Sequence, residues 1–178
     1  MKLTRRALLL TALPGVLLTV AGLVAGLGFG LRINTTKSLP LGLYQVTDQV
    51  HKGGYVSACV PLDAPTMRTA IERHYFPDGT CPGGVAPLLK HVAAVPGDTV
   101  TLTAEAVIIN GQALANTKTI YQDRYGARLE PVARGTFTVP PDTYWLIANE
   151  NRGSYDSRYF GPVPKAAIEH AMRPVLLF

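Results

Sequence analysis

The chain opens with a long run of apolar residues and continues as short segments in which apolar and polar positions alternate. Residues 7–30 contain no Asp, Glu, Lys or Arg. At a rise of about 1.5 Å per residue, a helix over this run exceeds the roughly 30 Å hydrocarbon layer of a bilayer. The run therefore predicts one N-terminal transmembrane helix.

The charges around this run predict its orientation. Basic residues are slightly more numerous before the run than directly after it, which favours a cytoplasmic N-terminus at residues 1–6 and an exported domain at residues 31–178. A cleaved secretory signal is the alternative. Against it, the apolar region is longer than the usual length of roughly 7–15 residues, and "GLGFG" provides no small-x-small cleavage site.

The exported part has the two-residue periodicity of β-strands. Alternating segments flank Asn110-Gly111, a strong signal for a two-residue hairpin turn. The 17 Gly and 14 Pro residues divide the chain into short elements, so we expect a mainly β, antiparallel domain with few short helices. The predicted strands lie at residues 42–46, 54–60, 98–114, 135–149 and 173–178, and the predicted helices at residues 64–75 and 165–170.

Composition and charge narrow the range of functions. With 47% hydrophobic and 16% charged residues, the chain is too apolar for a disordered protein. The net charge of +5 is modest and the basic residues never form a continuous block, which argues against nucleic acid as a partner. A mildly basic domain beside anionic lipid accounts for the charge more simply.

The only cysteines are Cys59 and Cys81. If the domain is exported, it lies in an oxidising compartment, so we expect a disulfide between them. The alternative is two unrelated small core residues. A metal site is not expected, because the chain has neither a C-x-x-C pair nor a Cys/His cluster, and no cofactor motif is present.

Three stretches, at residues 34–44, 88–98 and 149–162, carry the candidate chemistry. Lys90 begins an apolar, strand-like segment, and burial of an amine favours its neutral form. A neutral lysine can take the proton of a serine hydroxyl, as in a Ser-Lys dyad, and Ser38 is a candidate partner. The alternatives are a lysine that reaches solvent at the strand edge, an ordinary loop serine, and a turn at "NRGSYDSR".

The order and spacing of these stretches resemble the motif series of type I signal peptidases. In that family an apolar anchor precedes a serine, followed by a K-x-V-x-x-x-P-G-D motif and then by a polar motif of the "NRGSYDSR" kind. Within it, the chain is most similar to the TraF-type conjugal transfer peptidases, because proline follows the serine by two residues. The matching residues are Ser38, Pro40, Lys90, Val92, Pro96, Gly97, Asp98, Asn151, Arg152, Ser154, Asp156, Ser157 and Arg158.

The resemblance implies a signal-peptidase-like catalytic domain with a Ser-Lys dyad. Ser38 would be the nucleophile and Lys90 the general base. The hydroxyl of Thr36 and the backbone amide of Ser38 match the donors that stabilise the oxyanion in this family.

The resemblance also implies roles for the polar cluster near the C-terminus. Ser154 matches the serine that orients the lysine. Asp156 matches an acid that is required in the TraF type, and Arg158 is its expected partner. The resemblance allows two roles for Asp156, support of the fold and direct help in catalysis.

The function implied is a serine endopeptidase on the periplasmic face of the bacterial inner membrane. Its substrate would be a pilin precursor cut after small residues, with the product released linear or cyclised by its own amine. Other conjugative transfer proteins would be partners. Two alternatives stay open: a general signal peptidase that removes leader peptides, and a non-enzymatic assembly protein of a transfer pore.

Overall fold

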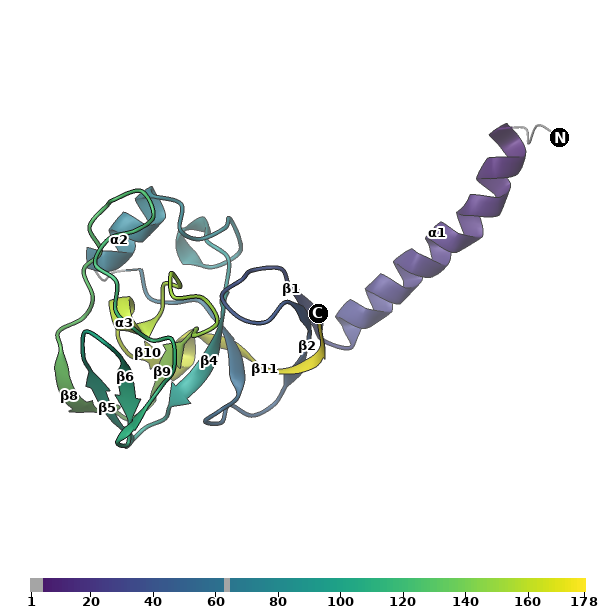
Figure 1. Ribbon diagram of the computed structural model, residues 1–178. Helices are drawn as coiled ribbons and strands as arrows, with labels where there is room; N and C mark the ends of the chain where they lie inside the picture. The colour runs from purple at the N-terminus through teal and green to yellow at the C-terminus, as the bar shows by residue number, and fades with distance from the viewer. Residues whose placement is uncertain (1–4, 63–64) are drawn as a thin grey trace.

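The computed structural model describes residues 5–62 and 65–178. The N-terminal helix α1 (Arg5–Gly28) projects away from a β-rich body formed by the rest of the chain (Figure 1). Apolar side chains on α1, such as Leu17 and Leu18, are exposed. Across the described ranges, no helix has the length and hydropathy needed to cross a bilayer. Residues 1–4 of the expected cytoplasmic segment lie outside the described chain.

The main body is a seven-stranded antiparallel sheet with the order β1-β2-β11-β3-β4-β9-β10. The C-terminal strand β11 lies between β2 and β3 and so joins the two halves of the sheet, with β1 at one edge. The strands are β1 (Leu31–Asn34), β2 (Gly42–Thr47), β3 (Tyr55–Ala58), β4 (Leu88–Ala94), β9 (Thr143–Ile147), β10 (Val163–Pro164) and β11 (Ile168–Leu177).

A second, four-stranded sheet has the order β7-β6-β5-β8. Its hairpin β6–β7 turns at Asn110 and Gly111, whose φ angles of 50° and 83° are the positive values that a type I′ turn requires. Trp145 of β9 and Ala94 of β4 pack with Val100 of β5, so buried side chains join the two sheets. The strands are β5 (Thr99–Leu102), β6 (Val107–Ile109), β7 (Gln112–Ala113) and β8 (Gly135–Thr138).

A separate core fills the space between the main sheet and helix α2 (Pro65–Glu72). It contains Val56 of β3, Val92 of β4, Leu146 of β9 and Met67 of α2. Alternate residues of a strand share a face, so Lys90, two residues before Val92, points into this core. The remaining short helices are α3 (Ser157–Phe160), η1 (Pro82–Gly84) and η2 (Lys165–Ala167).

The predicted fold class, mainly β and antiparallel with few short helices, is confirmed. The hairpin at Asn110-Gly111 and the helix α2 also lie where the pattern predicts them. The helix predicted at residues 165–170 is wrong. It is one 3-10 turn, η2, followed by the start of β11, because Ile168 and His170 pair with β3.

Cys59 and Cys81 form a disulfide with a Cα–Cα distance of 5.4 Å. It connects the end of β3 to the segment before β4 and closes a loop with a sequence separation of 22 residues. We expect replacement of both cysteines by alanine to lower the free energy of unfolding by about 3 kcal/mol, because the unfolded chain regains the entropy of that loop. Urea denaturation measures the change. Equal stability of the oxidised and reduced wild-type protein would contradict this expectation.

Candidate active site

Ser38 lies in the loop between β1 and β2, and the buried side chain of Asn34 holds this loop in place. The Asn34 amide nitrogen donates to the carbonyl oxygens of Leu39 (3.1 Å), Pro40 (2.9 Å) and Thr36 (3.1 Å). Its Oδ1 accepts from the backbone N–H (3.1 Å) and the hydroxyl (2.8 Å) of Thr36. One side chain therefore contacts the loop on both sides of Ser38.

The role of Asn34 was not anticipated from the sequence. A local signal exists, because asparagine side chains often accept the N–H two residues further along the chain, as Asn34 does from Thr36. The contacts to Leu39 and Pro40, five and six residues away, depend on the path of the whole loop and have no such signal.

We expect Asn34→Asp to loosen this loop selectively. A carboxylate would face three carbonyl oxygens without a proton to donate, which costs about 1–3 kcal/mol. Hydrogen exchange should then speed up in residues 35–41 while β4 stays protected. The matched control is Asn116→Asp, which makes the same change at an exposed site. Unchanged exchange in the loop would show that Asn34 does not hold it.

Lys90 sits on β4 opposite Val56 of β3 and is only 3% exposed. Burial lowers the pKa of Lys90 to about 8, and the positive charge of Arg158 acts in the same direction while the negative charge of Asp156 opposes it. His91, the next residue, lies on the other face of the sheet with its ring 5.5 Å from that of Tyr55. The amine of Lys90 is therefore poised to lose its proton near neutral pH.

Asp156 and Arg158 form a fully buried ion pair beside Lys90. Two charged hydrogen bonds of 2.8 Å join the guanidinium to the carboxylate. The carboxylate also accepts from the backbone N–H groups of Arg158 (3.1 Å) and Ala148 (3.0 Å), at the start of α3 and just after β9. With four donors around it, the carboxylate of Asp156 is positioned to hold the start of α3 against the end of β9.

Ser154 and Ser38 line the same cavity, although 116 positions separate them in the sequence. Ser154 is 3% exposed, and its hydroxyl has no hydrogen-bond partner among the described residues. Its carbonyl oxygen accepts from Arg158 (3.1 Å), which ties Ser154 to the ion pair. The segment 154–158 thus connects the cavity with the surroundings of Lys90.

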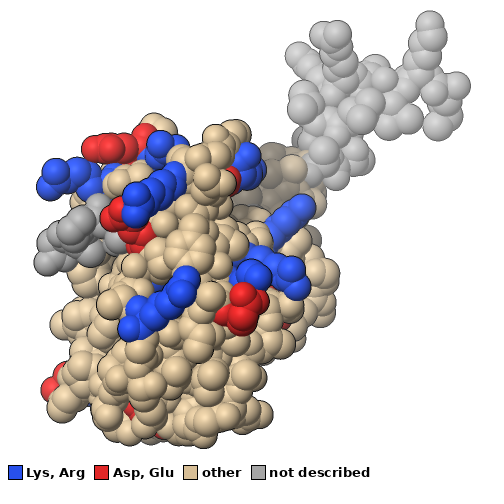
Figure 2. Space-filling model, turned by 60° about the vertical axis from the view of Figure 1, so that its left-hand side comes forward, with Lys and Arg blue, Asp and Glu red and all other residues tan. Residues whose placement is uncertain are grey.

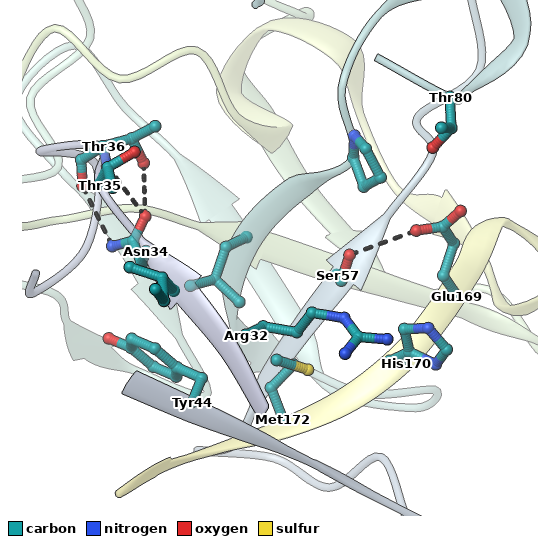
Figure 3. Close-up of a pocket in the computed structure, with 13 residues that line it drawn as sticks. Arg32, Asn34, Thr35, Thr36, Tyr44, Ser57, Thr80, Glu169, His170 and Met172 are labelled. Atoms are coloured by element: carbon teal, nitrogen blue, oxygen red, sulfur yellow. Dashed lines mark hydrogen bonds between the residues drawn. The ribbon is translucent and has the colours of Figure 1, made fainter. Parts of the chain in front are cut away.

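A second cavity, of about 470 Å³, is lined by residues that precede Ser38 in the chain. Asn34, Thr36 and Arg32 from β1 and its loop form one wall, and Glu169 and His170 of β11 lie across from them (Figure 3). The Thr36 hydroxyl, which donates to Asn34, belongs to this cavity. The segment from Asn34 to Ser38 therefore contributes residues to two cavities.

One group of potential metal ligands occurs in the part of the chain that the structure describes. It consists of Cys59, Cys81 and Glu169. Both sulfurs are engaged in the disulfide, so they do not offer thiolates to a metal ion.

Comparison with known proteins identifies the family. Residues 7–176 match the family described as "Signal peptidase, peptidase S26". The chain belongs to the peptidase S26 family. Among S26 relatives, "Conjugal transfer protein TraF" from Agrobacterium tumefaciens (strain 15955) is 39% identical over 179 residues, covering 98% of this chain and 97% of that protein. "Plasmid transfer protein TraF" from Escherichia coli is 37% identical over 157 residues, covering 86% and 88%.

An S26 relative with a different name matches a shorter region. "Signal peptidase I" from Leptolyngbya laminosa is 32% identical over 80 residues, covering 45% of this chain and 36% of that protein. The similarity to the TraF proteins thus extends over about twice as much of this S26 chain as the similarity to this signal peptidase I. The expected resemblance to S26 signal peptidases, and to TraF proteins in particular, is confirmed.

The S26 motif residues are brought together in part. Ser38 and Ser154 line the same cavity, and the charges of Asp156 and Arg158 affect the pKa of Lys90. Over the described residues, however, no hydrogen bond joins Ser38 to Lys90, and Lys90 does not line the cavity.

Proposed function

We propose that this S26 chain is a membrane-anchored serine endopeptidase that matures a pilin precursor for plasmid transfer. The observation that carries the proposal is the buried Lys90, whose pKa is lowered to about 8. Lys90 lies beside the segment that contains Ser154, and Ser154 lines the same cavity as Ser38. Family membership supports peptidase activity. The names of the TraF relatives support a role in plasmid transfer.

The proposed mechanism begins with proton transfer from Ser38 to neutral Lys90. As Oγ of Ser38 attacks the scissile carbonyl carbon, Nζ of Lys90 accepts the hydroxyl proton. The tetrahedral intermediate then breaks its C–N bond, Nζ of Lys90 donates the proton to the leaving amine, and an ester on Ser38 remains. The buried hydroxyl of Ser154 has no hydrogen-bond partner among the described residues. It can therefore accept a hydrogen bond from Lys90 and orient the amine.

The oxyanion of the intermediate would be stabilised by the backbone N–H of Ser38 and the hydroxyl of Thr36. The Thr36 hydroxyl donates to Asn34 in the structure at 2.8 Å. It must therefore rotate away from Asn34 before it can donate to an oxyanion. Asn34 would then hold the Thr36 hydroxyl in place until a substrate binds.

We assign Asp156 and Arg158 to positioning, not to proton transfer. The four donors around the Asp156 carboxylate support this assignment, since they occupy the sites where a substrate proton would arrive. The charges of Asp156 and Arg158 shift the pKa of Lys90 in opposite directions, so their pairing leaves burial as the main cause of its lowered value.

The anchor is proposed at residues 7–30, with residues 1–6 in the cytoplasm and residues 31–178 in the periplasm. The uncharged apolar run and the projection of α1 from the body support it. The disulfide fits an oxidising compartment. Ser38 follows the run closely, so a substrate cut beside its own membrane segment would meet the serine near the membrane surface.

The acyl ester on Ser38 can be resolved by water or by an amine. With water the pilin would be linear, and with its own amine it would be cyclic. Mass spectrometry of a co-expressed pilin precursor tests the proposal. A trimmed pilin with the wild-type protein and an intact precursor with Ser38→Ala are expected, and a product one water lighter than the trimmed chain identifies the cyclic form. Normal trimming with Ser38→Ala would favour a non-enzymatic assembly role.

A general signal peptidase is the second candidate, favoured by the 80-residue match to a signal peptidase I. The longer matches to TraF proteins favour a dedicated substrate. Expression in a host depleted of its own leader peptidase separates the two. Failure to restore growth supports the dedicated substrate, and restored growth supports the general enzyme.

The rate of cleavage should depend on pH through Lys90. Only the neutral amine can act as the base, so a pKa of about 8 means that the rate rises with pH up to about 8 and then levels off. Below that value we expect about a tenfold loss per pH unit. Single-turnover rates between pH 6 and 9.5 measure the profile, with circular dichroism as the folding control. A rate that is flat over this range would exclude Lys90 as the titrating base.

A further inference from the structure

The cavity that Ser38 lines also has charged residues in its lining. Its volume is about 760 Å³, within the range of ligand pockets. Ser38 and Ser154 line it together with three charged residues, Arg73, Arg124 and Asp123. The cavity therefore links the proposed nucleophile to a group of charged side chains from the end of α2 and from residues 120–129.

The carboxylate of Asp123 is fully engaged inside the protein. It accepts from the Tyr75 hydroxyl (2.5 Å) and from the backbone N–H groups of Tyr125 and Ala127 (2.8 Å each), and it lies 3.5 Å from Arg73. The hydrogen bond from Tyr75 is the main reason that the pKa of Asp123 is lowered. Asp123 thus stays ionised and offers little to a ligand.

Arg124 is the cation in this cavity that has no acidic partner among the described residues. It is exposed, its guanidinium lies 4.7 Å from the ring centre of Tyr125, and no carboxylate of the described chain lies within salt-bridge distance of it. Arg73 is partly neutralised by Asp123 at 3.5 Å. On the face that Figure 2 shows, Lys and Arg side chains gather over the upper part beside fewer Asp and Glu side chains. With Arg124 unpaired within the described chain and Arg73 only partly neutralised, the lining of this cavity is therefore suited to an anion.

The same cavity has an aromatic lining. The rings of Tyr155 and Tyr159 are stacked with centroids 4.8 Å apart, and Tyr75 lies 5.8 Å from Tyr155. The Tyr75–Asp123 hydrogen bond joins this lining to the loop that carries Arg124. Apolar surface next to a guanidinium fits a peptide that bears a carboxylate, because the rings can cover its apolar parts.

The chemistry of the ester-forming step indicates which part of the substrate faces this cavity. The leaving amine must take its proton from Lys90, which lies beside the segment 154–158, and Ser154 of that segment lines this cavity. The leaving segment should then extend into this cavity. The cavity with Thr36 and Asn34 remains for the part of the substrate that becomes the acyl group.

We infer that the cavity from Ser38 to Arg124 binds the leaving segment of the substrate and selects a carboxylate in it through Arg124. This inference rests on the proposed function and specifies the substrate class of that site. The carboxylate is either an acidic side chain or the free end of a short leaving peptide. Arg73 adds positive charge near the same carboxylate of the substrate. Its contact with Asp123 holds this wall of the cavity in place.

Peptide cleavage by the full-length protein in detergent tests the inference. The probes are peptides with three alanines before the scissile bond and one Glu or Gln among the first four residues after it, each with a free or an amidated C-terminus. We expect about tenfold higher kcat/KM for peptides with a carboxylate than for their neutral counterparts, the size of one charge-assisted hydrogen bond. Dependence on Glu identifies a side chain, and dependence on the free C-terminus identifies a chain end.

The variant Arg124→Gln should lose this preference, so that peptides with and without a carboxylate are cleaved with equal kcat/KM. Arg128→Gln is the matched control, because Arg128 lies in the same loop, pairs with Glu130 at 3.4 Å and does not line this cavity. It should keep the preference. Cleavage without any preference for a carboxylate, or a preference that survives Arg124→Gln, would overturn the inference alone. If the wild-type protein cleaves no peptide, the proposed function fails and the inference with it.

Discussion

Replacing Lys90 by alanine is expected to lower the rate of cleavage by about a hundredfold to ten-thousandfold, the usual contribution of a general base. The protein should remain folded, because alanine at this buried position removes a desolvated amine and leaves the strand pairing with Val56 intact. Single-turnover cleavage of the pilin precursor measures the loss, and thermal denaturation checks the fold.

Two further variants separate loss of the base from loss of the side chain. Lys90→Arg keeps a cation that does not give up its proton near neutral pH, so it should be as inactive as Lys90→Ala. Lys90→Cys treated with 2-bromoethylamine rebuilds an amine of nearly the same length, and activity should return. Because Cys59 and Cys81 are joined in a disulfide, the new thiol is the one that reacts. Substantial activity of Lys90→Arg would rule out proton transfer by this residue.

Replacing Asp156 by alanine is expected to destabilise the fold by about 3–5 kcal/mol. The substitution leaves the buried guanidinium of Arg158 without its charged partner and frees the N–H of Ala148. An unpaired buried charge has a cost of this size. Urea denaturation of the purified protein measures the change in the free energy of unfolding.

The double variant Asp156→Ala/Arg158→Met is the control for this effect. It removes both charges, so much of the stability lost in the single variant should return. Activity should stay low in the double variant if the pair positions Ser154 near Lys90, since Arg158 donates to the carbonyl of Ser154. A single Asp156→Ala variant as stable as the wild type would contradict a structural role for the ion pair.

The fold class could be predicted because local patterns decide most of it. Alternation of apolar and polar residues specifies the strands, and Asn110-Gly111 specifies a hairpin that needs no distant contact. The helix predicted at residues 165–170 shows the limit of such patterns. Its sequence favours a helix, but pairing with β2 and β3 holds the chain in β11 beyond the turn η2. Tertiary contacts override local preference here.

The candidate site could be located from the sequence only because its residues stand in three recognisable stretches. Burial of Lys90 follows from its apolar neighbours and from its place on a strand. The contacts of Asn34 with Leu39 and Pro40, the four donors around Asp156 and the cavity that leads to Arg124 do not follow from the sequence. Each depends on how loops that are distant in the sequence meet in space.

The most direct test of the central claim, that Ser38 is the nucleophile, is detection of its acyl ester. The wild-type protein is mixed with pilin precursor, quenched in acid within one turnover, digested, and analysed by mass spectrometry for the peptide that contains Ser38. We expect this peptide to carry the mass of the acyl segment in the wild type and to be unmodified in Lys90→Ala. Trimmed pilin formed without any acylated Ser38, or acylation at another residue, would contradict the Ser38–Lys90 mechanism.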